Sequence, residues 1–285
     1  MENPPSTKKI VIQGIKGAFH EIAARNYFHQ NDLQIIPAKT FDELITIAQN
    51  QEQADGAIMA IENSIAGSIM NNYSLINDSP LKITGELYLR IKQNLMVLPG
   101  TNIGQIKEVF SHPMAIAQCR PFFKNYPDIK LIENEDTALS AQMINEGKLQ
   151  HTGAIASSLA ADMYDLEIIN ESIETDKTNA TRFLILENEN LIDPTQVNNK
   201  TSISFSLAHR VGSLHTILAF LAKHDANLSK IQSVPISHTP WRYLFFIDFV
   251  GSEQTDYEAL INGLNQITKN FKILGRYKTG NHYED

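Results

Sequence analysis

The chain of 285 residues is long enough for about two domains, and its apolar (42%) and charged (20%) fractions are ordinary for a globular protein. Its formal charge of −8 argues against general binding to nucleic acid or to an anionic membrane, which requires a basic surface. A single cysteine excludes an internal disulfide and a zinc site built from cysteines. No run of about 18 apolar residues and no signal-peptide pattern is present, so we expect a cytoplasmic protein.

Short β-like runs alternate with helical patterns through the first 187 residues. This alternation is typical of an α/β protein with a parallel sheet, which binds ligands beyond the carboxyl ends of its strands. It occurs in two blocks, which predicts two lobes with a cleft between them. The expected strands are 9–13, 34–37, 57–61, 109–110, 131–132 and 153–156, and the expected helices are 18–30, 41–48, 114–124, 137–146 and 157–164.

The period of the apolar residues changes after a polar segment at 187–200, which we interpret as a linker. Beyond it the pattern predicts the order β-α-β-β-α-β in about 80 residues, the ferredoxin-like split motif. The expected strands are 201–207, 227–236, 241–250 and 271–277, with helices over 214–221 and 257–264. We expect the tail 282–285 to be frayed.

Four polar clusters lie where these predicted elements begin or end, and each has a functional and a purely structural interpretation. The Gly14–Ala18 turn could present N–H groups to an anion or be a plain strand-to-helix turn. Asn63 and Ser64 could bind a ligand or cap a helix, and His112 could be an acid, a base or a structural residue. Arg182 suits bidentate binding of a carboxylate, or it could be an ordinary surface arginine. The residues alone therefore indicate a two-lobed α/β domain with a polar cleft for a small anion.

Two other kinds of site are poorly supported. The nine histidines are scattered without metal-ligand spacing, and no G-x-S-x-G signature of a serine hydrolase is present. Cys119, expected in the second turn of a helix, is a better candidate for inert packing than for a nucleophile.

Five sequence blocks occur in the order found in prephenate dehydratases, and the chain resembles that family over residues 8–280. The blocks are G-x-x-G-A-F at 14–19, E-N-S-x-x-G-S at 62–68, S-H-P-x-A-x-x-Q-C at 111–119, T-A-x-S-A at 137–141 and N-x-T-R-F at 179–183. The C-terminal segment resembles an ACT regulatory domain. The resemblance implies a two-lobed catalytic domain like type 2 periplasmic binding proteins at 8–187, a linker at 188–200 and a ferredoxin-like βαββαβ ACT domain at 201–280.

The family's reaction is the decarboxylative dehydration of prephenate to phenylpyruvate, a carbon–oxygen lyase step of L-phenylalanine biosynthesis. The resemblance implies no metal and no organic cofactor. It assigns proton or hydrogen-bond donation at the leaving hydroxyl to Thr181, and we expect Arg182 to bind a carboxylate and Phe183 to shape the cleft. Further substrate contacts are expected at Ala18, Asn63, Ser64, Ser111, Gln118 and Asn179, with Glu62, Gly67 and His112 in supporting positions.

The family's ACT domain binds L-phenylalanine as an inhibitor, so we expect this effector and a homo-oligomer, a dimer or a dimer of dimers, paired through these domains. The expected effector residues are Gly212, Ser213, Leu214, Asn227, Leu228, Gln232, Ser233, Val234 and Pro235. The chain departs from the family pattern at two places. Q-S-V-P at 232–235 replaces E-S-R-P, and Q-N-L at 93–95 replaces H-C-L, so no histidine is available there.

Two other functions stay open at this point. Arogenate, which differs from prephenate by an amino group in place of the keto group, is an alternative substrate. A non-catalytic protein that binds a small acid or regulates through it would use the same kind of cleft. No helical extension that could form a chorismate mutase domain precedes Lys9, so we expect a monofunctional enzyme.

Overall fold

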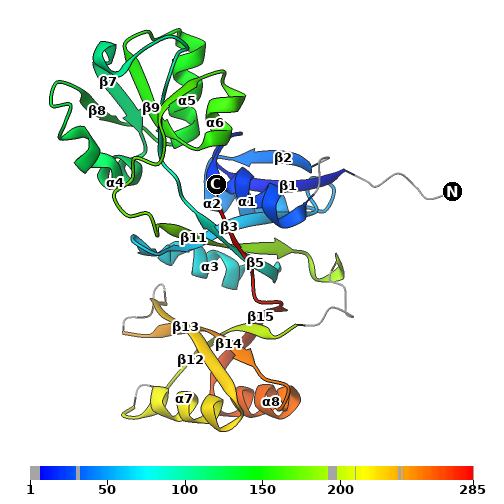
Figure 1. Cartoon of the computed structure of the whole chain (residues 1–285). Coiled ribbons are helices and arrows are strands. Elements are labelled where there is room, and N and C mark those ends of the chain that lie inside the picture. The colour runs from blue at the N-terminus through cyan, green and yellow to red at the C-terminus, as the bar shows by residue number, and fades with distance from the viewer. Residues whose placement is uncertain are drawn as a thin grey trace. The chain divides into compact units, whose positions relative to one another are not determined.

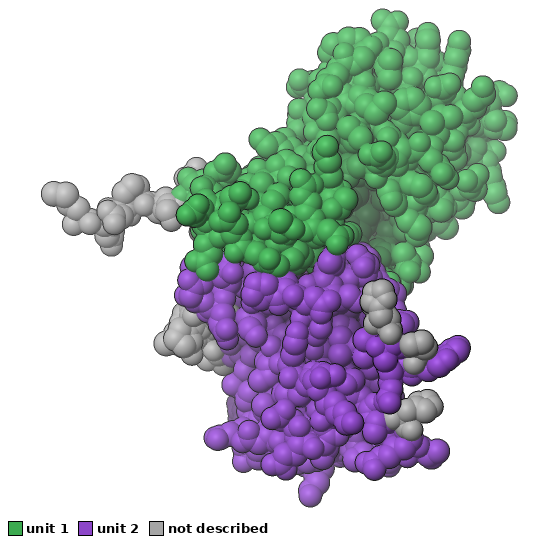
Figure 2. All heavy atoms as spheres, turned by 180° about the vertical axis from the view of Figure 1, so that it is seen from behind, with its two compact units in different colours: residues 1–68, 87–183, 282–285 green, residues 69–86, 184–281 purple. Residues whose placement is uncertain are grey.

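The computed structural model describes residues 7–29, 33–191, 198–208, 210–236, 239 and 241–284. The chain forms two compact units, drawn in different colours in Figure 2. Unit 1 contains residues 1–68, 87–183 and 282–285, and unit 2 contains residues 69–86 and 184–281. No helix among the described residues is long and apolar enough to cross a membrane.

The first sheet of unit 1 is built around three parallel strands, with β1 between β2 and β3 (Figure 1). The central strand carries the run Ile10–Ile12, which is fully buried, as expected for a strand covered on both faces. Helices α1 and α2 connect these strands, and the Thr40 hydroxyl caps α2 by accepting from the N–H of Glu43. The bounds are β1 Lys8–Gln13, α1 Phe19–Phe28, β2 Leu33–Ala38, α2 Phe41–Ala48, β3 Gly56–Asn63 and β4 Gly67–Ser68.

The second sheet of unit 1 has five strands in the order β10-β6-β9-β7-β8. It is mixed, because β6 runs antiparallel to both β9 and β10 while β7 is parallel to β8 and β9. Apolar side chains from its strands and from α4, α5 and α6 form two buried clusters. The bounds are β6 Asn94–Val97, β7 Glu108–Ser111, α4 Pro113–Phe123, β8 Lys130–Glu133, α5 Thr137–Gly147, β9 Thr152–Ala156, α6 Ser158–Met163 and β10 Glu167–Asn170, with a short 3-10 helix at Ile103–Gln105.

Two chain segments connect the sheets of unit 1, and we call them the crossing segments. Residues 91–93 lead from β5 (Lys82–Arg90) to β6, and residues 171–179 lead from β10 to β11 (Ala180–Glu187). β11 pairs with β3 and with β5 in the first sheet. Strands β5 and β11 both pass from one unit into the other, since the boundaries fall at 86/87 and 183/184.

Unit 2 contains the predicted order β-α-β-β-α-β, with an antiparallel sheet arranged β13-β14-β12-β15. Its two C-terminal helices, Ser213–Lys223 and Tyr257–Ile267, pack on one apolar cluster that includes Phe205, Ile247 and Leu264. On the sheet, the Lys200 ammonium pairs with the fully buried Glu86 carboxylate at 2.8 Å. The bounds are α3 Met70–Asp78, the 3-10 helix Glu189–Leu191, β12 Lys200–Ser206, α7 Ser213–Lys223, β13 Ala226–Pro235, β14 Tyr243–Gly251, α8 Tyr257–Ile267 and β15 Lys269–Tyr277.

Several sequence-based expectations need correction. The sheets are mixed rather than parallel, and strands β5, β6 and β10 and helix α3 were not predicted. The tail is not frayed at His282–Tyr283, because these residues form strand β16 against β5 and His282 stacks on Tyr88. Residues 192–197 of the expected linker lie outside the described residues.

Gly17 gives a test of the packing inside unit 1. Its φ is +88°, and a Cβ added there would lie 3.1 Å from the Ala160 Cα. We expect Gly17→Ala to lower the free energy of unfolding by about 2 kcal/mol or more, because strain and a backbone contact add up. Gly100→Ala is the control, since φ is +81° there but nothing lies within 4 Å of an added Cβ. Urea unfolding of both variants measures the difference, and equal losses would contradict a packing contribution at Gly17.

Candidate active site

The side chain of Asn63, at the carboxyl end of β3, is held in one orientation by the backbone of the following turn. Its Oδ1 accepts hydrogen bonds from the N–H groups of Ile65 (3.0 Å) and Ala66 (2.9 Å). Backbone N–H groups can only donate, so the atom that faces them must be the carboxamide oxygen. The opposite atom, Nδ2, is therefore an assigned donor and not an arbitrary choice between oxygen and nitrogen.

Asn63 Nδ2 donates to three acceptors on the neighbouring strand β11 and the residue before it. These are Thr181 Oγ1 at 3.0 Å, Asn179 Oδ1 at 2.7 Å and the Ala180 carbonyl at 3.2 Å. Thr181 is 8% exposed. Because its hydroxyl oxygen accepts from Asn63, its own proton can be donated to a third group. The geometry thus prepares Thr181 as a hydrogen-bond donor.

The chain of hydrogen-bonded side-chain amides continues from Asn63 to helix α4. Asn179 accepts from Asn63, so its Nδ2 is the donor to Gln118 Oε1, at 3.0 Å. Gln118 therefore uses its oxygen toward Asn179 and keeps the N–H groups of Nε2 for a ligand. Ser64 lies on the other side, where its hydroxyl accepts from the N–H of Ala180 at 3.0 Å. Four residues expected at the substrate, together with Thr181, are thus brought together: Asn63, Ser64, Gln118 and Asn179.

Arg182 has different surroundings from Thr181. Successive side chains of a strand point to opposite faces, so Arg182 leaves β11 on the face away from Thr181. It is 3% exposed, and its Nη1 lies 3.3 Å from Glu62 Oε1. Glu62 precedes Asn63 on β3, so the two strands pair carboxylate with guanidinium on one face and amide with hydroxyl on the other. This geometry shows Arg182 as a buried, neutralised cation.

Phe183 returns to the face of Thr181 and packs against a histidine that the sequence analysis did not select. The His20 ring meets Phe183 edge-on at 5.0 Å and Phe41 at 5.8 Å. Burial lowers the pKa of His20 to about 3, and its Nε2 accepts from the N–H of Ala60 at 3.3 Å. His20 is therefore a neutral core side chain behind Phe183. The only indication of His20 in the sequence was its position directly after Phe19, the last residue of the motif G-x-x-G-A-F.

Three N–H groups of the turn 14–18 donate within the protein and are not available to an anion. Gly14 N–H donates to the Ala38 carbonyl (2.9 Å) and Ala18 N–H to the Ile15 carbonyl (3.2 Å). Gly17 N–H donates at 2.8 Å to Glu21, a fully buried carboxylate that also pairs with Arg25 at 2.6 Å. These three groups are satisfied within the protein, so the turn is a structural connection there.

The remaining predicted residues of unit 1 are placed separately. The Ser111 hydroxyl is buried and donates to the Ile155 carbonyl at 2.6 Å, and helix α4 is capped by His112 Nδ1, not by Ser111. Gly67 adopts φ +81° in β4, with nothing near an added Cβ. Neither Asn63 nor Ser64 caps helix α3, whose N-cap is Ile69. Within the described residues, no group of three His, Cys, Asp or Glu side chains could hold a metal ion.

In unit 2 the residues expected at the effector do not form one cluster along β13. Asn227 and Gln232 are five residues apart on this strand, which places them about 16 Å from each other. Ser213 and Leu214, at the start of α7, line an open pocket of about 160 Å³ with Arg210, Trp241 and Arg242. Val234 is buried, and Gln232 donates to the Ser233 carbonyl. Two of the expected effector residues, Ser213 and Leu214, thus lie beside a pocket.

A comparison with known families identifies the chain. A family model described as prephenate dehydratase matches residues 10–191, more than half of the sequence. The chain belongs to the prephenate dehydratase family. The predicted interpretation as an enzyme of this family, a lyase, is confirmed.

Individual proteins and solved structures are similar to this prephenate dehydratase family member over nearly the whole chain. An arogenate dehydratase/prephenate dehydratase 1 of Arabidopsis thaliana is 37% identical over 95% of this chain and 72% of its own length. A prephenate dehydratase of Arthrobacter aurescens in complex with L-Phe is 27% identical, with a TM-score of 0.84 over 95% of this chain and 89% of that one. A structure described as a novel type of quorum quenching acylase has a TM-score of 0.86 at 27% identity, covering 95% and 98%.

The neutral His20 predicts a pH dependence of stability. The pKa of His20 in the folded protein, about 3, lies below the ordinary value of 6.5. Between pH 6.5 and 3 this side chain is therefore protonated in the unfolded chain but stays neutral in the folded protein. We expect the wild type to lose up to about 1.4 kcal/mol per pH unit from this group as the pH falls from 6.5 toward 3. Denaturant unfolding of wild type and His20→Gln at each pH measures it, since glutamine does not titrate. A difference between the two proteins that stays constant with pH would contradict the assignment.

Proposed function

We propose that this chain converts prephenate to phenylpyruvate, with loss of CO2 and water, and that Thr181 is the donor to the departing hydroxyl. The observation that carries the proposal is the hydrogen bond from Asn63 to Thr181 Oγ1, with the orientation of Asn63 fixed by two backbone N–H groups. A hydroxyl that already accepts directs its proton to a third group. The roles of the other site residues of unit 1 in binding the substrate belong to the same proposal.

The chemistry needs little covalent assistance. As the ring carboxylate leaves as CO2, its bonding electrons move into the ring, the C4–O bond breaks and the departing oxygen takes a proton. Thr181 Oγ1 supplies or shares that proton and recovers one from solvent. A threonine hydroxyl is a weak acid, so its position and its low exposure in the site carry much of the effect. Gln118 Nε2 is an additional donor that orients the substrate, whereas the Ser64 hydroxyl donates its proton to the Thr178 carbonyl at 3.4 Å.

The substrate carboxylates need positive charge or several neutral donors. Arg182 pairs with Glu62 on the face of the sheet away from Thr181, so the expected direct binding of a carboxylate by Arg182 is not supported by this geometry. We propose instead that neutral donors such as Gln118 Nε2 bind the substrate carboxylates. We propose prephenate ahead of arogenate. The Arabidopsis relative is named for both substrates, so the two must be compared directly.

We also propose an ACT domain at 201–280, preceded by a linker at 188–200, with L-phenylalanine as its effector. The βαββαβ order and the pocket beside Ser213 and Leu214 support this. The family member from Arthrobacter aurescens is described as a complex with L-Phe. Four further features remain predictions: a two-lobed catalytic domain at 8–187, a homo-oligomer paired through 201–280, a cytoplasmic location and a single catalytic activity. The molecular mass in solution, measured by light scattering, tests the pairing.

Acyl transfer, named for one structural neighbour, is less well supported by the site. It requires a nucleophile activated by a base. The described partner of the Thr181 hydroxyl is the amide of Asn63, which cannot take a proton from it. Burial raises the pKa of the Cys119 thiol, which opposes formation of a thiolate.

Thr181→Val tests the donor. Valine keeps the shape of the side chain and removes the hydroxyl, so we expect kcat to fall by about 100-fold or more with a small change in KM. Thr181→Ser is the matched control and should keep most of the turnover. Phenylpyruvate formation from prephenate, followed by absorbance, gives both constants. A Thr181→Val enzyme with wild-type kcat would remove Thr181 from this role, and turnover of arogenate alone would change the substrate.

L-Phenylalanine tests the effector proposal independently of the donor. We expect it to inhibit prephenate turnover by the wild type and to raise the melting temperature, since a ligand that binds only the folded protein stabilises it. L-Alanine at equal concentration is the control, because it lacks the ring. Turnover unaffected by L-phenylalanine, with an unchanged melting temperature, would contradict an effector site in unit 2.

A further inference from the structure

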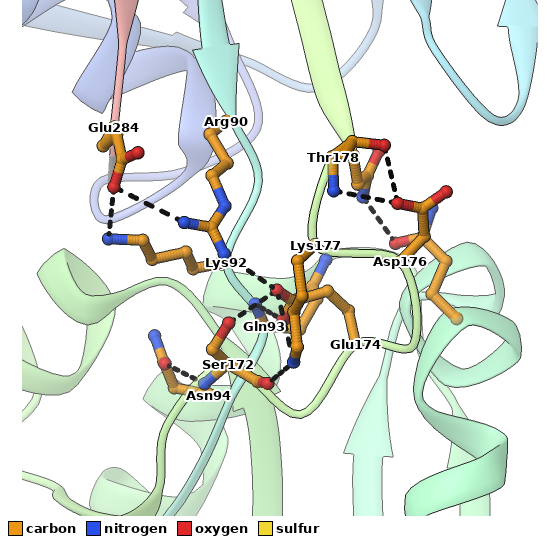
Figure 3. A network of polar contacts seen from close by, with 12 residues as sticks. Arg90, Lys92, Gln93, Asn94, Ser172, Glu174, Asp176, Lys177, Thr178 and Glu284 are labelled. Carbon is orange, nitrogen blue, oxygen red and sulfur yellow. Dashed lines mark hydrogen bonds and ion pairs between the residues drawn. The ribbon is translucent and has the colours of Figure 1, made fainter.

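The buried carboxylate of Glu174, which lies outside the amides and hydroxyls described above, is the centre of a polar network in unit 1 (Figure 3). It is 1% exposed. Its Oε2 accepts from the N–H of Gln93 at 2.9 Å, and its Oε1 accepts from the Ser172 hydroxyl at 2.6 Å. Arg90 Nη2 and Lys177 Nζ each lie 3.8 Å from Oε1. A buried carboxylate with this many partners is fixed in place, because leaving it unpaired away from water is strongly unfavourable.

The partners of Glu174 join the two crossing segments. Gln93 belongs to the first segment, and its carbonyl accepts from the N–H of Ile173 in the second at 2.7 Å. Further along, the N–H of Ile91 donates to the Asn179 carbonyl at 2.8 Å. Glu174 therefore lies between two backbone contacts that hold the segments side by side, and its carboxylate adds a third.

The second crossing segment leads directly into the site. Thr175 donates through both its N–H and its hydroxyl to the Gln118 carbonyl, at 2.9 Å each. Asn179, at the end of the segment, connects Asn63 to Gln118, and Thr181 follows two residues later. A displacement of residues 172–179 would thus move the amides of Asn179 and Gln118 and the strand that carries Thr181. Misplacement of about 1 Å can cost 100-fold in rate.

We propose that Glu174 is a positioning residue for the reaction, whose carboxylate fixes the segment 172–179 and through it Asn179, Gln118 and Thr181. This inference rests on the proposed function for its effect on turnover. The charge of Glu174 is balanced by Arg90 and Lys177. The C-terminal tail extends the network outward, because Glu284 Oε2 lies 3.4 Å from Arg90 and 3.3 Å from Lys92. Glu284 is 69% exposed, so solvent screens this outer pair and its contribution is small.

Glu174→Gln is the main test, with Glu284→Gln as the matched control in the same network. Glutamine keeps the size and one acceptor but removes the charge and presents N–H groups to donors. We expect kcat with prephenate to fall by about 10- to 100-fold and KM to change less than about threefold for Glu174→Gln. Glu284→Gln should stay within about twofold of wild type in both constants. Wild-type kcat in Glu174→Gln, or an equal loss in both variants, would overturn the proposal.

The single cysteine provides a readout that does not depend on turnover. Cys119 is fully buried in α4, next to Gln118, so we expect it to react with a maleimide only when this region opens. We expect faster labelling in Glu174→Gln than in the wild type. Because Glu174 also helps to raise the pKa of the thiol, Ser172→Ala is the second variant. It keeps the charge and removes only the 2.6 Å hydrogen bond, so faster labelling there reports opening alone.

The two assays separate the inference from the proposed function. If the wild type does not convert prephenate, the proposed function fails, and the labelling rates alone decide whether Glu174 holds the segment. If the wild type is active and Ser172→Ala has both wild-type kcat and wild-type labelling, the positioning role fails. Lower kcat with faster labelling in Ser172→Ala supports it, including where Glu174→Gln does not fold.

Discussion

The carboxamide of Asn63 is the constraint on which the site depends. Two backbone N–H groups of its own turn define its oxygen, and its nitrogen then defines the roles of Thr181 and Asn179. Each subsequent amide has one possible orientation, so the donors that face a ligand are fixed before a ligand arrives. Such preorganisation costs no rearrangement during the reaction, which is where electrostatic stabilisation of a transition state is most effective.

The network around Glu174 holds in position the chain segment that carries part of this site. The amides transmit orientation only while β3, α4 and the segment 172–179 keep their distances, and hydrogen bonds of this kind weaken steeply with geometry. The backbone contacts Ile173–Gln93 and Ile91–Asn179 connect the crossing segments, and the buried Glu174 carboxylate adds a hydrogen bond between them by accepting from the N–H of Gln93. Orientation and position thus depend on two separate sets of polar contacts, one at the end of β3 and one at the crossings.

Much of this could be predicted from the sequence, for identifiable reasons. Strong periodicity gave β1, β3, α7 and α8, and ordered motifs gave the family and the cluster of Asn63, Gln118, Asn179 and Thr181. Strand β5 was missed because its run K-I-T-G-E-L-Y-L-R mixes apolar residues with glycine and charges whose partners lie far along the chain, such as Lys200 on Glu86. The buried His20 and Glu174 were missed for the same reason, because nothing local shows that their side chains accept from the distant N–H groups of Ala60 and Gln93.

The motif T-R-F shows why adjacent motif residues need not share a contact. Strand geometry sends Thr181 and Phe183 to one face of β11 and Arg182 to the other. Thr181 meets the Asn63 amide, Phe183 packs on His20, and Arg182 pairs with Glu62. The neighbouring block E-N-S follows the same alternation on β3, with Glu62 and Asn63 on opposite faces. The two blocks therefore specify a pair of strands in register, and only one face of that pair presents the hydroxyl that the proposed reaction uses.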